Sequence, residues 1–591
     1  MRAAPLTRTL VLLAALACAL AAVPPPAWAE SYTKLSGSGS TWSSNALDQW
    51  RRNIGANIGL TVNFSASGSS VGREEFKNGV SDFGVSEIPY GLTEGRTTDV
   101  PPTKRSYAYM PIVAGGTSFM YNLKIGGKKV TNLRLSGEVI TKLFTGRITM
   151  WNAPEIKADN PGLTLPARRV VPVVRSDGSG TTAQFTTWMA KKHGSLWNDY
   201  CRRAGRSTPC GMTSYYPVVP GSSTVAKSGS LGVSGFTKQS SFEGAITYVE
   251  YSYAIKTGFP VAKMLNSEGY YVEPTSSSVA VALQQARINE NKNSPNYLTQ
   301  ILDGVYVNRD RRSYPLSSYS YMIIPTSTEL GFTTGKGKSL GTFANYFLCD
   351  GQQQAEELGY SPLPMNLVQA GFSQVRRIPG APVADIKISS CRNPTFSSDG
   401  SNTLAKKAPY PKECDKRGPT QCSTGTAGAA REETPVVPAA RGDGGGGGGT
   451  NSGGASGGSG SGTASGGSGS GTASGGNASS TGGSSGSGGA TDSGGSGTGG
   501  SPDGSAAAAA AGGTGDGGAV DPDTGEPLGS EAGTGDASVV GTPVTLASGG
   551  SMGLRGALMA LSAALLLGVV VGPPVVARAL AGRARRRGDE R

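Results

Sequence analysis

Three short turns rich in glycine and serine hold the residues of this chain that are best suited to chemistry. They span residues 37–41, 67–72 and 175–181, and each follows a short apolar run and precedes a helix-like stretch. Such turns expose backbone N–H groups at the positive end of a helix dipole, where an anion is favoured. Serine and threonine hydroxyls add donors, and Arg175 adds a guanidinium. Taken singly, each turn is also an ordinary helix cap, but together they predict a site for a small oxyanion.

The segments that must position these turns alternate between strand-like and helix-like patterns. The expected strands are 61–65, 82–86, 109–114, 170–175, 245–248 and 319–324. The expected helices are 41–53, 72–78, 136–144, 180–192, 277–288 and 342–350. Strands that alternate with helices predict an α/β fold in which helices cover parallel sheets.

Other kinds of chemistry find little support in the sequence. No G-x-x-x-x-G-K-[S/T] motif is present, and the single histidine, His193, lies in a basic helix end. We therefore expect no enzyme activity, no metal and no cofactor. The formal charge of +13 comes largely from arginines near the two ends of the chain, and no basic block is interleaved with aromatic residues. Nucleic acid is accordingly not an expected partner.

The N-terminus has the pattern of a secretory signal peptide over residues 1–29. Arg2 and Arg8 precede an apolar run, and Ala27-Trp28-Ala29 supplies the small residues expected before a cleavage site. Residues 423–549 consist mainly of Gly, Ser, Ala and Thr, with too few large apolar side chains to offset the entropy of ordering the backbone. We expect this segment to be a disordered linker.

An apolar stretch at residues 556–577 is long enough to cross a membrane as a helix. The tail 578–591 that follows it includes Arg583, Arg585, Arg586 and Arg587, which predicts a cytoplasmic C-terminus. The expected location is therefore the cell membrane, with a single span and an extracellular binding domain. A cell-wall sorting signal is the alternative, but Leu546-Ala547-Ser548-Gly549 lacks the threonine at which such a signal is cut.

Six cysteines remain outside the signal peptide, and an even number in an exported chain indicates disulfides. The short spacings favour the pairs Cys201–Cys210 and Cys414–Cys422, which leaves Cys349 to pair with Cys391. A zinc site is the competing interpretation, but the chain contains no C-x-x-C motif.

The motifs and their order resemble a known family, the phosphate-binding proteins that feed phosphate ABC importers. The motifs are GSGST at 37–41, GSS at 68–70, DFGVSE at 82–87, RSDGSGTTAQFTTWMA at 175–190 and GAITYVEYSYA at 244–254. The resemblance implies a type II periplasmic-binding-protein fold over residues 30–422, with two α/β lobes joined by a hinge of two crossing strands. Lobe 1 would hold about 31–110 and 315–395, and lobe 2 about 111–314.

The resemblance also implies which residues bind the ligand. The matching positions are Ser40, Thr41, Ser69, Glu87, Arg175, Asp177, Ser179, Gly180 and Thr181. Arg175 would be the sole guanidinium on the anion, and Asp177 would hold that arginine. The family normally has aspartate where this chain has Glu87. That carboxylate accepts a hydrogen bond from a protonated phosphate, and it excludes sulfate, which has no proton to donate.

The expected function is therefore extracytoplasmic binding of phosphate and its delivery to the membrane permease of an ABC importer. Two alternatives stay open. The longer side chain of Glu87 and the long linker would also fit a surface structural or adhesion protein with the same fold. A binder of another oxyanion, such as sulfate or molybdate, would use the same donors.

Overall fold

The computed structural model describes residues 31–94, 97–294, 296–382, 391–397 and 399–437. The predicted signal peptide, nearly all of the predicted linker, the predicted span at 556–577 and the basic tail lie outside these residues. Within the described part of the chain, no helix combines the length and apolar character that crossing a membrane requires.

One eight-stranded sheet organises the described residues, with the strand order β11-β10-β12-β6-β17-β3-β1-β2. Its strands are β1 (Leu35–Gly39), β2 (Val62–Ser65), β3 (Phe83–Ser86), β6 (Tyr107–Tyr121), β10 (Val171–Arg175), β11 (Val225–Lys227), β12 (Ala245–Glu250) and β17 (Ser317–Pro325). Strands β1, β2 and β3 are parallel, and so are β10, β11 and β12. We call these two groups, with the helices that pack on them, the β1 side and the β10 side.

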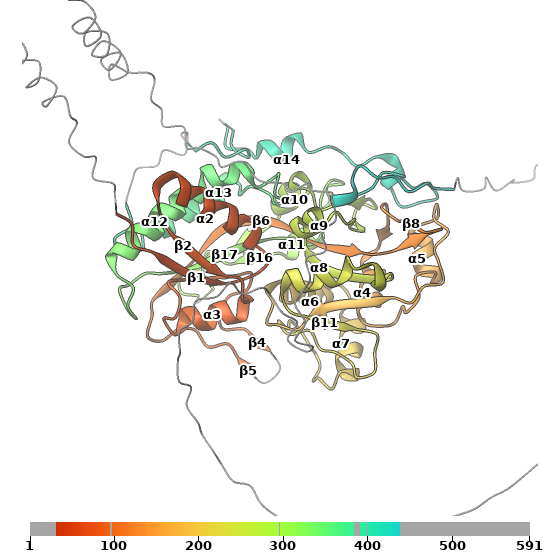
Figure 1. Cartoon of the computed structure of the whole chain (residues 1–591), viewed down its shortest axis with the longest axis horizontal. Coiled ribbons are helices and arrows are strands. Elements are labelled where there is room, and N and C mark those ends of the chain that lie inside the picture. The colour runs from red at the N-terminus through yellow and green to blue at the C-terminus, as the bar shows by residue number, and fades with distance from the viewer. Residues whose placement is uncertain (1–30, 95–96, 295, 383–390, 398, 438–591) are drawn as a thin grey trace, which may run out of the picture. The chain divides into compact units, whose positions relative to one another are not determined.

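Helices cover both sides, as alternating strands and helices predict (Figure 1). Those of the β1 side are α2 (Ser44–Ile58), α3 (Ser69–Lys77), α12 (Thr334–Leu348) and α13 (Met365–Val375). Those of the β10 side include α4 (Gly137–Phe144), α5 (Pro154–Asp159), α6 (Gly180–Lys192), α7 (Gly194–Arg203), α8 (Gly229–Thr237) and α9 (Tyr251–Thr257). The remaining α-helices are α10 (Ser276–Leu283), α11 (Asp303–Tyr306) and α14 (Thr403–Lys407).

Short strands complete the secondary structure. They form the pairs β4 (Thr93–Glu94) with β5 (Thr97–Thr98), β7 (Lys124–Ile125) with β8 (Lys128–Lys129), and β15 (Arg287–Ile288) with β16 (Gln300–Ile301). A three-stranded sheet joins β9 (Arg134–Leu135), β13 (Lys263–Leu265) and β14 (Tyr271–Val272). The mixed α/β fold expected from the sequence is therefore confirmed.

Most predicted elements are present, but several boundaries were wrong, and two helices show why. The helix expected at 277–288 ends at Leu283, because Arg287 and Ile288 instead pair with β16. The helix expected at 342–350 begins earlier, at Thr334. Its first turns contain Gly335 and Gly337, and glycine is a poor helix former, so helix propensity did not predict these turns. The Thr333 hydroxyl nevertheless caps this end by accepting the N–H of Lys336 at 3.2 Å.

The strands β6 and β17 lie at the centre of the sheet and connect its two sides. Residues 107–116 of β6 pair with β17, and residues 117–121 pair with β12. The β6–β17 register shifts between Ser320 and Tyr321, which face Val113 and Pro111, so Ile112 has no partner in the register. A proline has no N–H for the ladder, which suits a bulge at this point.

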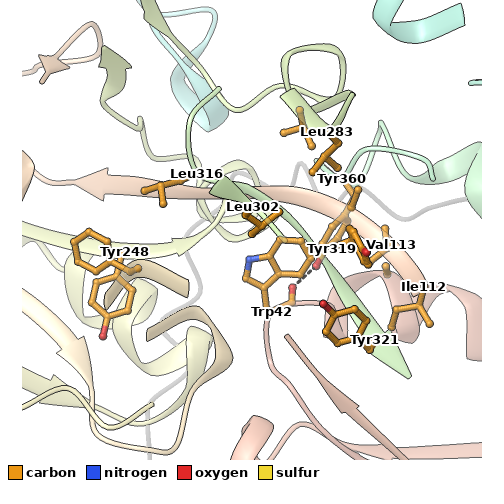
Figure 2. Close-up of a cluster of buried hydrophobic side chains, with 14 of the residues drawn as sticks. Trp42, Ile112, Val113, Tyr248, Leu283, Leu302, Leu316, Tyr319, Tyr321 and Tyr360 are labelled. Carbon is orange, nitrogen blue, oxygen red and sulfur yellow. Dashed lines mark hydrogen bonds between the residues drawn. The ribbon is translucent and has the colours of Figure 1, made fainter. Parts of the chain in front are cut away.

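Aromatic side chains pack around these two central strands (Figure 2). The Tyr360 hydroxyl donates to the carbonyl of Trp42 at 2.6 Å, and the two rings meet edge to face at 5.8 Å. Tyr319 and Tyr321 of β17 also meet edge to face, with ring centroids 5.4 Å apart. The segment that follows Ser40 and Thr41 is thus anchored on Tyr360, whose neighbour Ser361 forms a bridge to Ala114 of β6.

Glu250, the last residue of β12, is fully buried near this cluster, and its Oε1 has no hydrogen-bond partner among the described residues. Its Oε2 accepts the backbone N–H of Ser252 at 2.8 Å. Burial raises the pKa of the Glu250 carboxyl well above its ordinary value of 4.5, although hydrogen bonds from Ser252 oppose the rise. A neutral side chain at this position should therefore suit the folded protein at neutral pH.

The variant Glu250→Gln should change how stability depends on pH. An unfolded glutamate ionises near pH 4.3, roughly, while the buried one keeps its proton, so wild-type stability falls as pH rises from there toward the folded pKa. Glutamine does not ionise, so the variant does not lose stability in this way. The free energy of unfolding of the variant, relative to that of the wild type, should therefore increase as pH rises. Urea denaturation across this range checks it. A difference in unfolding free energy that does not change with pH would contradict it.

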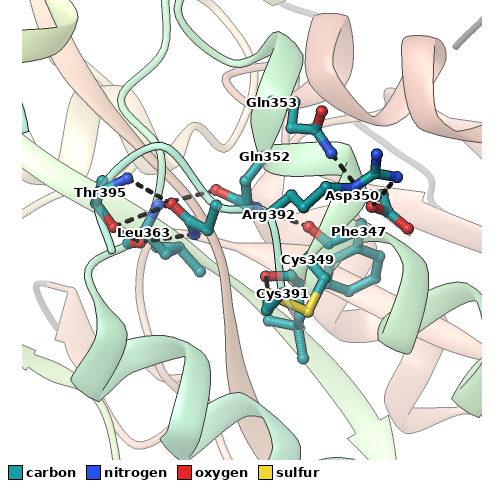
Figure 3. Close-up of a disulfide and its surroundings, with 11 residues drawn as sticks. Phe347, Cys349, Asp350, Gln352, Gln353, Leu363, Cys391, Arg392 and Thr395 are labelled. Atoms are coloured by element: carbon teal, nitrogen blue, oxygen red, sulfur yellow. Dashed lines mark hydrogen bonds and ion pairs between the residues drawn. A yellow bond between two sulfur atoms is a disulfide. The ribbon is translucent and has the colours of Figure 1, made fainter. Parts of the chain in front are cut away.

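The three disulfides predicted from the spacings are confirmed: Cys201–Cys210, Cys349–Cys391 and Cys414–Cys422. Figure 3 shows how the bond from Cys349 to Cys391 attaches the C-terminal extension, residues 391–397 and 399–437, next to α12. Nearby, the side chain of Asn393 donates to the carbonyl of Leu363 at 3.0 Å.

The C-terminal extension then contacts the β10 side. The guanidinium of Arg134 donates to the carbonyls of Cys414 and Thr420, at 3.0 and 2.8 Å. Lys263 forms a buried ion pair with Asp415 at 2.8 Å. These contacts continue past residue 422, the predicted end of the folded domain, because residues 423–437 also pack here and Val437 donates to the carbonyl of Gly162 at 2.9 Å. The predicted boundary at 422 was thus too early.

Candidate anion-binding site

The three turns singled out in the sequence meet where the β1 side faces the β10 side. The first two are joined by the N–H of Gly68, which donates to the carbonyl of Gly39 at 2.8 Å. The second and third are joined by the N–H of Ser70, which donates to the carbonyl of Gly178 at 3.0 Å. Gly68 has a φ of +98°, a left-handed conformation that favours glycine. A Cβ there would lie 2.8 Å from Oδ2 of Asp177, so glycine also permits this close approach.

Arg175 and Asp177 form the charged part of the site. Arg175 ends β10, its side chain is only 2% exposed, and its Nε donates to Oδ1 of Asp177 at 2.7 Å while Nη2 donates to Oδ2. Burial alone would raise the pKa of the Asp177 carboxyl, but the hydrogen bonds and charge of Arg175 outweigh it and the pKa lies below its ordinary value. The two-point pairing fixes the plane of the guanidinium, which leaves Nη1 directed elsewhere.

The Nη1 atom of Arg175 points toward a fourth turn that sequence reasoning missed. It lies 3.4 Å from the hydroxyl of Ser230, which in turn lies 2.8 Å from the hydroxyl of Thr41 across the two sides. The N–H of Gly229 donates to Oδ1 of Asp177 at 2.8 Å. The sequence KSGSLG at 227–232 has the same pattern as the other turns, small residues after a strand and before helix α8, and could have identified these residues.

The start of helix α6 brings Ser179, Gly180 and Thr181 to the same place. The Ser179 hydroxyl caps the helix by accepting the N–H of Thr182 at 3.2 Å, so this side chain stabilises the start of α6. The N–H of Gly180 donates to the hydroxyl of Ser69 at 3.0 Å. The Thr181 hydroxyl is buried and has no partner among the described residues, which leaves it able to bind a ligand.

Glu87 lies among these donors and is 1% exposed. Its Oε2 accepts the hydroxyls of Ser40 and Ser69, at 2.8 and 2.9 Å. Its Oε1 accepts the hydroxyl of Ser320, which the sequence did not identify. Glu87 therefore points into the site and accepts hydrogen bonds from two hydroxyls predicted to bind the anion.

All nine predicted ligand-binding positions thus come from turns that the fold brings together, with Ser40, Thr41, Ser69 and Glu87 on the β1 side and Arg175, Asp177, Ser179, Gly180 and Thr181 on the β10 side. Arg175 is the guanidinium among them, and Asp177 and Glu87 are acceptors. Among the described residues, no group of three or more His, Cys, Asp or Glu side chains is placed to hold a metal ion. The geometry suits a small anion that offers both acceptor oxygens and a proton.

Comparisons with known proteins agree with this chemistry. The model of the PBP superfamily domain matches residues 24–351, more than half of the 591-residue chain. The chain is 29% identical over 346 residues to a phosphate-binding protein PstS of Xylella fastidiosa, covering 58% of this chain and 86% of that protein. It is 30% identical over 332 residues to the phosphate-binding protein PstS 3 of Mycobacterium tuberculosis, covering 56% and 82%.

A solved phosphate-binding protein of Stenotrophomonas maltophilia aligns with 63% of this chain and 99% of its own, at 16% identity and a TM-score of 0.43. The family assignment rests on the sequence matches. The chain therefore belongs to the PBP superfamily, and within it to the phosphate-binding-protein (PstS) family that its motif order predicts, whose members are binding proteins rather than enzymes.

Proposed function

We propose that this chain binds inorganic phosphate outside the cytoplasm and delivers it to the membrane permease of an ABC importer. The observation that carries the proposal is the convergence of Arg175, the start of helix α6 and several hydroxyls around the buried acceptor Glu87. An oxyanion placed there would receive charge-assisted hydrogen bonds from a fixed guanidinium and would gain from the helix dipole. The relatives named as phosphate-binding proteins support phosphate as that oxyanion.

The fold would serve binding through movement of its two sides. In a type II periplasmic-binding-protein fold, the β1 side and the β10 side are the two lobes, and β6 and β17 are the crossing strands of the hinge. A hydrogen bond between the Thr41 and Ser230 hydroxyls and one from the N–H of Gly180 to the Ser69 hydroxyl join the lobes directly at the site. We propose that the lobes part to admit the anion and close around it.

The ends of the chain complete the proposal. The signal pattern at residues 1–29 would export the protein, and the apolar stretch at 556–577 would hold it in the membrane with the tail 578–591 in the cytoplasm. The segment between Val437 and that stretch would act as a tether between the binding domain and the importer.

The anion that the protein retains identifies its ligand. The full-length protein is purified without added phosphate, denatured, and the released anions are separated by ion chromatography. We expect phosphate in a stoichiometric amount. Release of sulfate or molybdate instead would favour a binder of another oxyanion, and a protein that retains no anion and binds none on titration would favour a structural or adhesion role.

Glu87 should determine which oxyanion binds. A carboxylate next to a fully deprotonated sulfate is a juxtaposition of like charges that costs several kcal/mol, roughly, whereas a protonated phosphate can donate to it. Glu87→Gln should therefore lower the ratio of phosphate to sulfate affinity by about tenfold or more. Competition titrations measure the ratio, with the exposed Glu74→Gln as the control. An unchanged ratio in Glu87→Gln would mean that another group excludes sulfate.

A further inference from the structure

The hydrogen bonds around Glu87 determine which groups donate to each oxygen of its carboxylate. The Ser40 hydroxyl accepts the N–H of Trp42 at 3.0 Å, and the Ser69 hydroxyl accepts the N–H of Gly180 at the same distance. Each hydroxyl carries one proton, and in each case that proton points to Oε2 of Glu87. The two serines therefore hold one oxygen of the carboxylate from the β1 side.

The other oxygen is held from the central strand β17. Strands β3 and β17 are antiparallel, and Tyr321 lies opposite Ser86, the last residue of β3. The same register brings Ser320 opposite Glu87, and the Ser320 hydroxyl donates to Oε1. Ser320 is fully buried and lies at the register shift with β6, where a bulge can aim a side chain at a functional site.

The backbone of Glu87 is also fixed. Its carbonyl accepts the side-chain amides of Gln184 of α6 at 2.8 Å and of Gln300 of β16 at 3.3 Å. With the main chain held in this way, the orientation of the carboxylate depends on its three hydroxyl donors. Of these three hydroxyls, only that of Ser320 can be removed while Ser40 and Ser69, the two serines of the anion site, are kept.

A carboxylate offers about four acceptor positions, and hydroxyls of Ser40, Ser69 and Ser320 occupy three of them. The position that remains is on Oε1, the oxygen that Ser320 holds. A group that fills it must be a donor, and among small oxyanions only one that carries a proton has a donor to offer.

We propose that Ser320 is a positioning residue for ligand selection: it orients Glu87 so that Oε1 keeps a free acceptor position for the proton of the bound oxyanion. This inference rests on the proposed function. It adds a residue on a central strand, outside the turns that carry the anion site, to the determinants of specificity.

The test compares the affinities of inorganic phosphate and sulfate by isothermal titration of the full-length protein. Ser320→Ala should lower the phosphate-to-sulfate ratio by about tenfold, because a loosely held carboxylate excludes sulfate less well. In a Glu87→Gln background the same change should have no further effect on the ratio, since the group that Ser320 orients is gone. Ser318→Ala is the control: it removes a buried hydroxyl of the same strand that has no partner among the described residues.

A second pair of variants separates the hydroxyl from packing. Ser320→Thr and Ser320→Val have nearly the same shape and both suit a strand, but only threonine keeps the hydroxyl. The threonine variant should discriminate against sulfate about tenfold better than the valine variant. Three results would each overturn the inference. The first is the same phosphate-to-sulfate affinity ratio in Ser320→Thr and Ser320→Val. The others are equal losses of affinity for both anions in Ser320→Ala, and the same effect of Ser320→Ala on the ratio in the wild-type and Glu87→Gln backgrounds. A wild-type protein that binds no phosphate would instead refute the proposed function.

Discussion

Replacing Arg175 by alanine is expected to lower phosphate affinity by more than about 100-fold, because the loss of one member of a buried, hydrogen-bonded charge pair costs about 3 kcal/mol or more. Two effects add. The anion loses the guanidinium, and Asp177 keeps its largely buried carboxyl without the partner that lowers its pKa. A carboxylate left without that partner would also repel an incoming anion. Isothermal titration with phosphate measures the loss.

The control for this variant is Arg312→Ala. Arg312 is paired at two points with Asp310, also two residues away, with distances of 2.9 and 2.7 Å. It contacts the carbonyls of Ala405 and Ala408 and lies outside the anion site. We expect Arg312→Ala to leave phosphate affinity unchanged, whereas Arg175→Lys, which keeps the charge but not the planar fork, should fall between alanine and wild type. Wild-type affinity in Arg175→Ala would remove this arginine from the site.

Gly180→Ala should have the second large effect, since this glycine makes room for Glu87. A Cβ at position 180 would lie 2.0 Å from Oε2 of Glu87 and 2.6 Å from the hydroxyl of Ser69. Both groups must move, and forcing extra volume into a packed place costs about 1–3 kcal/mol. Because Glu87 and Ser69 belong to the anion site, their displacement should also lower phosphate affinity, by roughly 10- to 100-fold. Alanine is otherwise a better helix former than glycine, so helix α6 should persist.

Gly194→Ala is a matched control, because Gly194 is also the first residue of its helix, α7, and a Cβ there meets nothing within 4 Å. Its phosphate affinity should equal that of the wild type. Circular dichroism and the urea unfolding midpoint show whether both variants fold. If Gly180→Ala folds and binds phosphate as tightly as Gly194→Ala, then Glu87 does not occupy the position next to α6 during binding.

The sequence was informative about the site because its residues follow a local rule. Each turn places small residues with hydroxyls between a strand and a helix, and such turns gather where neighbouring strands end. Arg175 at the end of β10 and Gly180 at the start of α6 could be predicted from this rule, and the helix 180–192 was predicted to the residue.

Residues whose role depends on pairing between distant segments could not be predicted in this way. Ser320 faces Glu87 only through the register of β17 with β3. Gly229 and Ser230 had the local signature, but their contact with Asp177 and Arg175 comes from the neighbouring positions of β10 and β11 in the sheet. The folded domain was not predicted to extend to residue 437, because a segment rich in glycine and threonine is typical of a linker. In the structure, however, Thr426 and Thr434 are buried and bond to Val261 and Thr131.

If Arg175, helix α6 and Glu87 form a site for phosphate, a direct titration will show it. Inorganic phosphate is added to phosphate-depleted full-length protein in a calorimeter, and sulfate is added in a parallel experiment. We expect saturable binding of phosphate at one site per chain, more than about 100-fold weaker in Arg175→Ala and retained in Arg312→Ala, with far weaker binding of sulfate. Absence of heat from phosphate in the folded wild-type protein, or equal binding of phosphate by both arginine variants, would contradict it.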